Sequence, residues 1–123
     1  MIRYSPSEAA QKSGFSLDTL RYYEKIGLLS DIDRTSGGKR IFSDDDLGWL
    51  GLLRCLRDTG MPIAQMCRFA ELVRSGDMTI TERVELLEEH ARGVETQLEL
   101  LLRQQQHLHD KIAYYQRELA ARA

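Results

Sequence analysis

The chain has 123 residues, which is enough for one compact domain with an extended element and excludes most multidomain enzymes. Hydrophobic residues make up 42% and charged residues 29%, with only 2 prolines, so the composition is that of a folded protein. The net charge of -2 by itself disfavours a nucleic-acid partner, because phosphate binding relies on Lys and Arg. No stretch approaches the ~20 apolar residues of a membrane span, and no signal peptide is present, so we expect a cytoplasmic protein without a membrane partner.

The charge is unevenly distributed along the chain. Residues 1–43 carry seven bases against five acids, whereas residues 77–123 carry six bases against nine acids. The N-terminal part is therefore mildly basic and the C-terminal part acidic. Cys55 and Cys67 are too few and too far apart for a disulfide framework or a CxxC metal site, so both are expected to be free thiols.

Two short helices are predicted within residues 5–26. Ser5, Pro6 and Glu8 form the pattern of a capping box with proline at the first helical position. Gly14 ends this first helix, and Ser16 caps a second one that runs to about Ile26. Two short helices joined by a tight turn are typical of a helix-turn-helix.

The next segment, 31–42, predicts a two-stranded wing. Gly37 and Gly38 lie between short flanks, as the tip of a β-hairpin requires, and basic residues surround them. Ser43 and three following acids then begin a helix over 44–59. A fourth helix is expected over 63–75, after the break at Gly60 and Pro62.

From residue 77 to the end, the pattern indicates one long helix. Thr79 and Glu82 have the spacing of another capping box, and the following segment contains no proline. Apolar residues recur at alternating steps of three and four, which is the heptad pattern of a coiled coil. The expected dimerisation residues of this seam are Val84, Leu87, Val94, Leu98, Leu101, Leu108, Ile112 and Tyr115.

This helix would be roughly 60 Å long at 1.5 Å per residue, too long to bury its seam against the small N-terminal part. We therefore expect a homodimer through the helix, with Gln105 as a candidate polar position that sets the register. The predicted division is a DNA-binding unit over 1–76 and a dimerisation helix over 77–123.

These segments together resemble the MerR-type transcriptional regulators. The resemblance rests on the block from Thr19 to Leu29, the wing residues 38–43, the helix start at 45–47 and the break at 60–63. It implies a mainly α fold: a winged helix-turn-helix with a small β-hairpin wing, followed by a long helix that forms an antiparallel coiled coil in the dimer.

The resemblance also implies a homodimer that binds a pseudo-palindromic promoter operator, distorts the DNA and affects RNA polymerase indirectly. The second helix would lie in the major groove and the wing on the flanking backbone or minor groove. The expected DNA-binding residues are Tyr4, Ser16, Thr19, Arg21, Tyr22, Tyr23, Arg34, Lys39 and Arg40. Two alternatives stay open: either Tyr22 or Tyr23 is mainly a core residue, and Arg40 forms an ion pair with Asp31 or Asp33 instead.

Within the family, the sequence around Cys55 resembles the AdhR/NmlR branch, in which a single cysteine responds to aldehydes or other thiol-reactive electrophiles. Arg54 and Arg57 would favour the nucleophilic thiolate. The alternative is that Cys55 is a small buried apolar residue of its helix.

No cofactor or metal is expected. His107 and His109 point about 200° apart on a helix and cannot chelate one ion. The chain shows no catalytic constellation, so an enzyme is not expected. Two further alternatives are a regulator that needs no inducer, with Cys55 structural, and a coiled-coil adaptor that binds no DNA.

Overall fold

The structure is a computed structural model that describes residues 2–123. Residues up to Val84 form one compact unit, and Glu85–Ala123 form a second. Within residues 2–123, no helix is both long and apolar enough to cross a membrane. The elements in chain order are β1 (Arg3–Tyr4), α1 (Pro6–Ser13), α2 (Leu17–Lys25), β2 (Asp33–Arg34), β3 (Arg40–Ser43), α3 (Asp44–Asp58), α4 (Ile63–Arg74), the 3-10 helix η1 (Asp77–Thr79) and α5 (Ile80–Arg122).

The predicted caps of α1 and α2 are confirmed. The Ser5 hydroxyl accepts from the Glu8 backbone N–H at 3.2 Å, and the Glu8 carboxylate accepts from the Ser5 N–H at 3.0 Å. Gly14 ends α1 in the left-handed region at φ 80°, which a residue without Cβ adopts at little cost. Ser16 then caps α2 by accepting from the Thr19 N–H at 3.0 Å.

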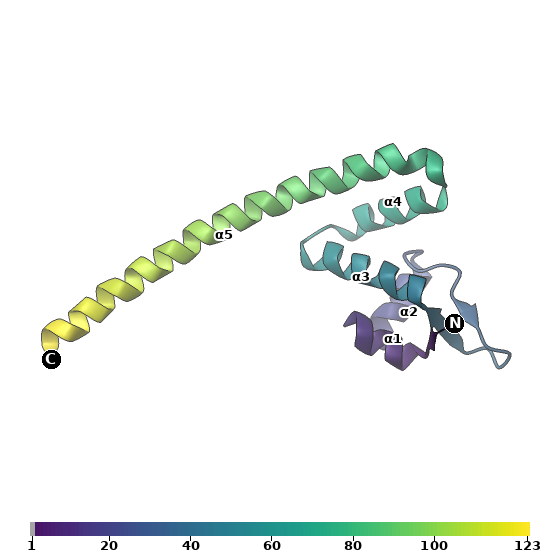
Figure 1. Cartoon of the computed structure of the whole chain (residues 1–123), viewed down its shortest axis with the longest axis horizontal. Helices are drawn as coiled ribbons and strands as arrows, with labels where there is room; N and C mark the ends of the chain where they lie inside the picture. Colours follow the sequence, from purple (N-terminus) through teal and green to yellow (C-terminus); the bar gives the residue numbers. More distant parts are fainter. Residues whose placement is uncertain (1) are drawn as a thin grey trace. The chain divides into compact units, whose positions relative to one another are not determined.

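The small sheet has three strands rather than the two that the sequence predicts. Its order is β1-β3-β2, and both pairings are antiparallel, with Tyr4 opposite Phe42 and Arg34 opposite Arg40. The extra strand, β1, has two residues and stops before Pro6, so it is too short to show an alternating pattern. Pairing with β3 ties the N-terminus to the wing and to α3, which follows β3 directly (Figure 1).

The core of the first unit contains buried side chains from α1, α2, α3, α4 and the sheet. Phe42, Leu28, Leu50, Leu53 and Met66 are its largest fully buried side chains, and they come from β3, the loop after α2, and both later helices. Figure 1 shows α1 beside α3, and α1 also contacts α2. The core thus holds α2 and the wing on one scaffold.

The junction between α4 and α5 differs from the prediction. A short 3-10 helix, η1, ends at Thr79, and the Thr79 side chain does not cap α5. Its buried hydroxyl instead donates to the carbonyl of Leu72 in α4, and Arg83 donates to the Thr79 hydroxyl at 3.0 Å and to the Gly76 carbonyl at 2.6 Å. The predicted capping box at 79–82 is wrong because this hydroxyl is directed back toward α4.

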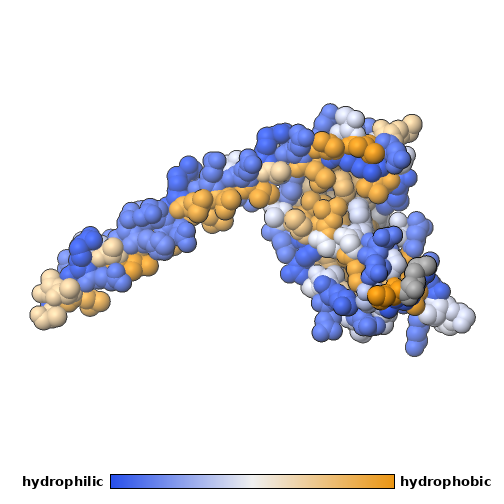
Figure 2. Space-filling model, in the orientation of Figure 1, coloured by the Kyte–Doolittle hydropathy of each residue, from blue (hydrophilic) through white to orange (hydrophobic). Residues whose placement is uncertain are grey.

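Helix α5 contains 43 residues and forms most of the second unit. Apolar residues run along the helix in Figure 2. Six of the eight predicted dimerisation residues are exposed in the single chain, whereas Leu87 and Val94 are half-buried. The six exposed ones are Val84, Leu98, Leu101, Leu108, Ile112 and Tyr115.

Candidate nucleic-acid interface

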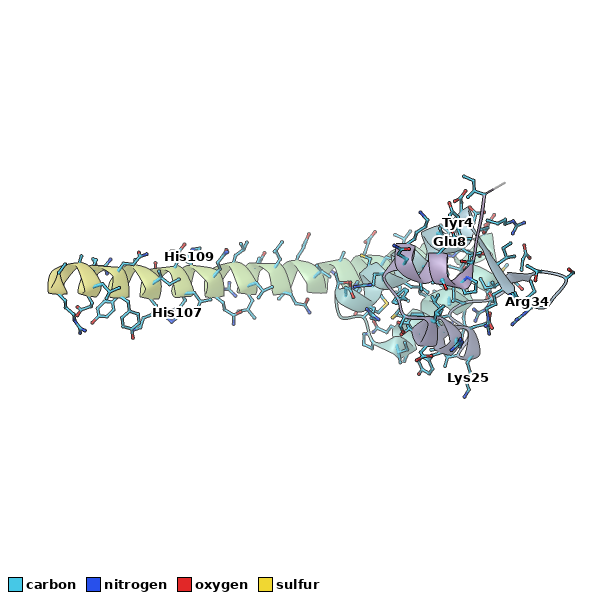
Figure 3. All side chains as sticks on the ribbon, turned by 90° about the horizontal axis from the view of Figure 1, so that it is seen from below. Tyr4, Glu8, Lys25, Arg34, His107 and His109 are labelled. Carbon is cyan, nitrogen blue, oxygen red and sulfur yellow. The ribbon has the colours of Figure 1, made fainter. Side chains whose placement is uncertain are left out.

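Helix α2 divides its side chains between the core and the solvent. Leu20 and Tyr23 are buried, and Tyr23 is only 3% exposed. Arg21, Tyr22 and Lys25 lie on the exposed side, and Tyr22 is 50% exposed. Figure 3 shows Lys25 projecting from the end of the helix. Of the two tyrosines, Tyr23 is therefore the core residue, in line with one of the two expectations for this pair, and Tyr22 faces solvent.

Two polar residues at the start of α2 bond to each other. The Ser16 hydroxyl donates to the Thr19 hydroxyl at 2.9 Å while it caps the helix. Arg21 lies one turn after Asp18, and their charged atoms are 3.1 Å apart. Both side chains of this pair are more than half exposed, so the ion pair is weak and the guanidinium is accessible to a ligand.

The tip of the wing is a tight turn that presents Lys39. Gly38 has φ 84°, and the Thr35 backbone N–H donates to the Lys39 carbonyl at 2.7 Å. The Thr35 hydroxyl accepts from the Lys39 N–H at 3.2 Å, which closes the turn from the other side. Lys39 itself is exposed, and its ammonium has no ion-pair partner within residues 2–123.

The other two cations of the wing bind a carboxylate of α2. Arg40 donates to both carboxylate oxygens of Glu24, from Nε at 3.0 and 3.1 Å and from Nη2 at 2.8 Å. Arg34 reaches the same carboxylate at 3.5 Å and donates to the Gly38 carbonyl at 3.0 Å. The hydrogen bonds from Arg40 hold the pKa of the Glu24 carboxyl below its ordinary value, and Glu24 raises the pKa of Arg40 in turn.

This arrangement corrects the expected partner of Arg40, since neither Asp31 nor Asp33 takes that role. Asp33 instead accepts from Arg3 of β1 at 2.8 Å. Sequence reasoning missed Glu24, which lies 10 and 16 residues before its two partners. No local pattern marks such a pair, and only the packing of the wing against α2 brings the three side chains together.

Tyr4 lies at the opposite edge of the sheet. Its hydroxyl donates to the Asp44 carboxylate at 2.8 Å, and this hydrogen bond raises the pKa of Tyr4. The Lys12 ammonium lies 5.4 Å from the centre of the Tyr4 ring. Figure 3 shows Tyr4 beside Glu8, at the start of α1.

The turn between α1 and α2 is held by α3. The buried Phe15 ring packs edge-on against Tyr23 at 5.2 Å, and the Arg57 guanidinium lies 4.8 Å from its centre. Arg54 donates to the Gly14 carbonyl at 2.7 Å. These contacts fix the angle at which α2 leaves the turn.

Cys55 is an exposed thiol on α3, which corrects the alternative of a buried apolar residue. The two neighbouring arginines both bind Asp58. Arg54 donates to the Asp58 carboxylate at 2.6 Å and Arg57 lies 3.5 Å from it, and the hydrogen bond from Arg54 lowers the pKa of Asp58. The expected activation of Cys55 by these cations therefore has to compete with an ion pair.

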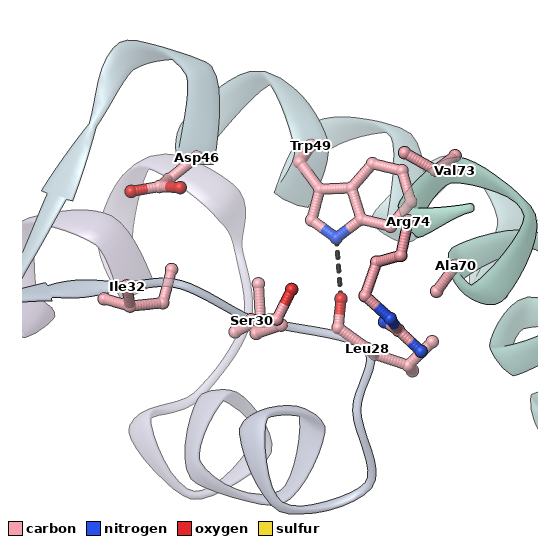
Figure 4. Close-up of a pocket in the computed structure, with 9 residues that line it drawn as sticks. Leu28, Ser30, Ile32, Asp46, Trp49, Ala70, Val73 and Arg74 are labelled. Atoms are coloured by element: carbon pink, nitrogen blue, oxygen red, sulfur yellow. Dashed lines mark hydrogen bonds between the residues drawn. The ribbon is translucent and has the colours of Figure 1, made fainter. Parts of the chain in front are cut away.

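A hollow of about 140 Å³ lies behind the loop that joins α2 to the wing (Figure 4). The Trp49 indole N–H donates to the Leu28 carbonyl at 2.7 Å, and the ring stacks on Phe69 at 5.8 Å. Arg74 reaches over from α4 to donate to the Gly27 carbonyl at 2.6 Å. The polar groups of Leu28, Asp46 and Arg74 that line the hollow all form hydrogen bonds within the chain. The bonds from Trp49 and Arg74 anchor the end of α2.

His107 and His109 lie on opposite sides of α5 in Figure 3, as their spacing predicts. Among the described residues, no group of three or more His, Cys, Asp and Glu side chains is placed to hold a metal ion.

The fold and this surface define a winged helix-turn-helix protein with a long C-terminal helix. The MerR HTH regulatory protein family matches residues 4–71, and the chain belongs to this family. An uncharacterized HTH-type transcriptional regulator of Haemophilus influenzae is 44% identical over 119 residues, which cover 97% of this chain and 88% of the relative. The regulator AdhR of Bacillus subtilis is 31% identical over 90 residues, which cover 72% and 64% of the two chains.

Solved structures agree with this assignment. The crystal structure of HiNmlR, described as a MerR family regulator lacking the sensor domain and bound to promoter DNA, has a TM-score of 0.89 and 44% identity. The match covers 97% of this chain and 94% of that one. A putative MerR family regulator from Listeria monocytogenes has a TM-score of 0.84 and 35% identity, over 91% and 85% of the two chains. The relatives named here are transcriptional regulators.

Proposed function

We propose that this protein is a transcriptional regulator that binds a pseudo-palindromic promoter operator as a homodimer and distorts the DNA. The observation that carries the proposal is the likeness to a promoter-bound regulator over 97% of the chain, combined with the exposed cationic face of α2. With this function, we expect the protein to act in the cytoplasm, where its promoter lies. We also expect it to affect RNA polymerase indirectly and to have no enzymatic activity.

In this proposal α2 enters the major groove. Arg21 reads a guanine edge or binds a phosphate, and Tyr22 offers a phenol hydroxyl to the backbone. Ser16 and Thr19 lie at the N-terminal end of the helix, where the helix dipole favours binding of a phosphate. Tyr23 acts from the core by holding the helix in place. Tyr4, already bonded to Asp44, would offer its ring edge to the flanking backbone.

The wing rests on the flanking backbone or minor groove, with Lys39 as its phosphate-binding cation. Arg34 and Arg40 lie opposite each other in the strands, next to the turn that forms the tip. The exposed seam of α5 pairs with the same seam of a second copy in an antiparallel coiled coil, which gives a DNA-binding unit over 1–76 and a dimerisation unit over 77–123. Members of the MerR family act as homodimers on DNA, which supports this arrangement. A dimer of this kind contacts two half-sites and can bend or twist the DNA between them.

The test is selection of a binding site from random duplexes, followed by mobility-shift titration. We expect Arg21→Gln to weaken binding to the selected duplex about tenfold or more. Arg103→Gln is the matched control, because it removes the same charge from an exposed position of α5. Failure of the wild type to bind any duplex in a salt-dependent way would support a coiled-coil adaptor instead.

We further propose that Cys55 senses aldehydes or other thiol-reactive electrophiles. Its exposed thiol favours this role over a structural one, and AdhR is among the relatives. The thiol adds to an electrophilic carbon; with an aldehyde, an S–C bond forms and the proton passes to the carbonyl oxygen. The modified side chain on α3 then alters how α3 holds the helix-turn-helix, since Arg54 and Arg57 beside it contact the turn.

A promoter-reporter assay under aldehyde stress tests this role. We expect Cys55→Ala to abolish induction and Cys67→Ala, the half-buried cysteine, to leave it intact. Normal induction in the Cys55→Ala variant would show that Cys55 is not the sensor. Absence of induction in the wild type as well would favour a regulator without an inducer, in which Cys55 has only a structural role.

A further inference from the structure

We infer that Glu24 determines specificity by keeping two wing arginines away from the DNA phosphates. This inference rests on the proposed DNA binding and deepens it. In it, Glu24 is a positioning residue that acts through Arg40 and Arg34, and it does not itself contact DNA.

The geometry of the cluster supports this role. Arg40 places two nitrogens on the Glu24 carboxylate at 2.8–3.1 Å, and the side chains are only 30% and 26% exposed. A bidentate, charge-assisted pair of this kind is stronger than an exposed ion pair and fixes the planes of both groups. The guanidinium that Arg40 would need for a phosphate is therefore already engaged.

Arg34 extends the cluster into the tip of the wing. One of its nitrogens lies 3.5 Å from the Glu24 carboxylate, while another donates to the Gly38 carbonyl. Arg34 and Arg40 are also directly opposite each other in the β2–β3 pairing. One carboxylate of α2, that of Glu24, thus contacts both strands of the wing and, through Arg34, the turn that presents Lys39.

Among the described residues, the two lysines of this face, unlike its arginines, have no ion pair. Lys39 and Lys25 are exposed, and neither ammonium has an ion-pair partner within residues 2–123. They are available for phosphates on any sequence. A phosphate contact by a freed arginine needs no particular base sequence, so the restraint of Arg34 and Arg40 lowers non-specific binding.

Restraint also contributes to specific binding. A wing held at a fixed position relative to α2 can contact the backbone only when α2 is in its correct register. A wing freed from Glu24 could find phosphates at several registers. The same ion pair therefore opposes non-specific contacts and favours the specific one.

The experiment compares full-length wild type with Glu24→Gln on two duplexes of equal length. One is a site selected from a random pool by the wild type, and the other is a random sequence. We expect Glu24→Gln to bind the random duplex about fivefold more tightly at 0.1 M salt, with a slope of log affinity against log salt steeper by about one. Its preference for the selected site should fall correspondingly.

Two further variants distinguish a cation that contacts DNA phosphates from an arginine that Glu24 holds away from them. Lys39→Gln should make the salt slope shallower by about one, because it removes a phosphate contact. Arg40→Gln should leave the slope unchanged yet lower the preference for the selected site. Arg40→Gln also tests the inference should Glu24→Gln fail to fold, which its thermal unfolding midpoint would reveal.

The inference is overturned if Glu24→Gln leaves random-duplex affinity and the salt slope at wild-type values, or if Arg40→Gln makes the slope shallower as Lys39→Gln does. Either result leaves the proposed function intact, because the wild type still selects and binds its site. Absence of any selected site for the wild type would instead defeat the proposed function itself.

Discussion

Gly14 occupies a left-handed backbone position in the helix-turn-helix that favours glycine. Its φ is 80°, and a Cβ there would lie 2.2 Å from Nη1 of Arg54, the same nitrogen that donates to the Gly14 carbonyl. We expect Gly14→Ala to lower the free energy of unfolding by about 2 kcal/mol, since the left-handed backbone alone costs ~1–2 kcal/mol. Urea unfolding followed by circular dichroism measures this loss.

The control is Gly48→Ala, in the exposed part of α3. A Cβ there meets nothing within 4 Å, and the backbone is helical. This substitution should raise the free energy of unfolding by roughly 0.5–1 kcal/mol, because alanine favours a helix more than glycine. Equal effects of the two substitutions would contradict the role assigned to the turn.

The Glu24–Arg40 pair also predicts a pH dependence of stability. The pKa of Glu24 is lowered in the folded chain, mainly by its hydrogen bonds from Arg40, so the pair stabilises the fold above the ordinary carboxyl pKa of about 4.3. This contribution is lost as the pH falls through the lowered folded value. The free energy of unfolding of the wild type should therefore exceed that of Arg40→Gln near neutral pH, and the difference should shrink below about pH 4.

Urea titrations of both proteins between pH 3 and pH 7 measure this difference. Glu8 and Asp58, whose pKa values are also lowered, are present in both proteins and cancel in the comparison. A difference that stays constant over the whole range would show that Arg40 stabilises the wing through packing alone.

At the scale of whole elements, the features that depend on residues close in sequence could be predicted. The caps of α1 and α2 join groups three residues apart, so local chemistry determines them. Strand β1 could not be found because its partner, β3, is about 40 residues away. The exposed residues of α2 were likewise predictable from helical spacing, whereas Glu24 as the partner of the wing was not.

At the junction of α4 and α5, the local sequence pattern gave a wrong prediction, the capping box at 79–82. The Thr79 hydroxyl donates to the Leu72 carbonyl and accepts from Arg83, so three elements depend on it. We expect Thr79→Val to cost about 1–3 kcal/mol in the free energy of unfolding, because it keeps the volume and removes the hydrogen bonds of the buried hydroxyl to the Leu72 carbonyl and from Arg83. Thr79→Ser keeps the hydroxyl and should cost clearly less. Urea unfolding compares the two variants, and equal losses would indicate that the methyl group contributes as much as the hydroxyl.

At the scale of the whole molecule, the single chain leaves an apolar seam on α5 uncovered. Leu98, Leu101 and Leu108 are all more than half exposed, and a continuous row of exposed leucines favours association. The net charge of -2, taken alone, disfavoured a nucleic-acid partner. It is nevertheless compatible with DNA binding by the N-terminal part, because this part is mildly basic and the acidic excess lies on α5.

The seam predicts how oligomeric state depends on single residues. The wild type should sediment as a dimer, and Leu101→Glu should shift it to monomer at micromolar concentration, because the substitution places a charge in an apolar interface. Thr96→Glu adds the same charge on the opposite side of the helix and should remain dimeric. Analytical ultracentrifugation measures both. Operator binding should fall together with dimerisation in Leu101→Glu, since one unit alone contacts one half-site; a monomeric wild type, or a dimeric Leu101→Glu, would contradict pairing through this seam.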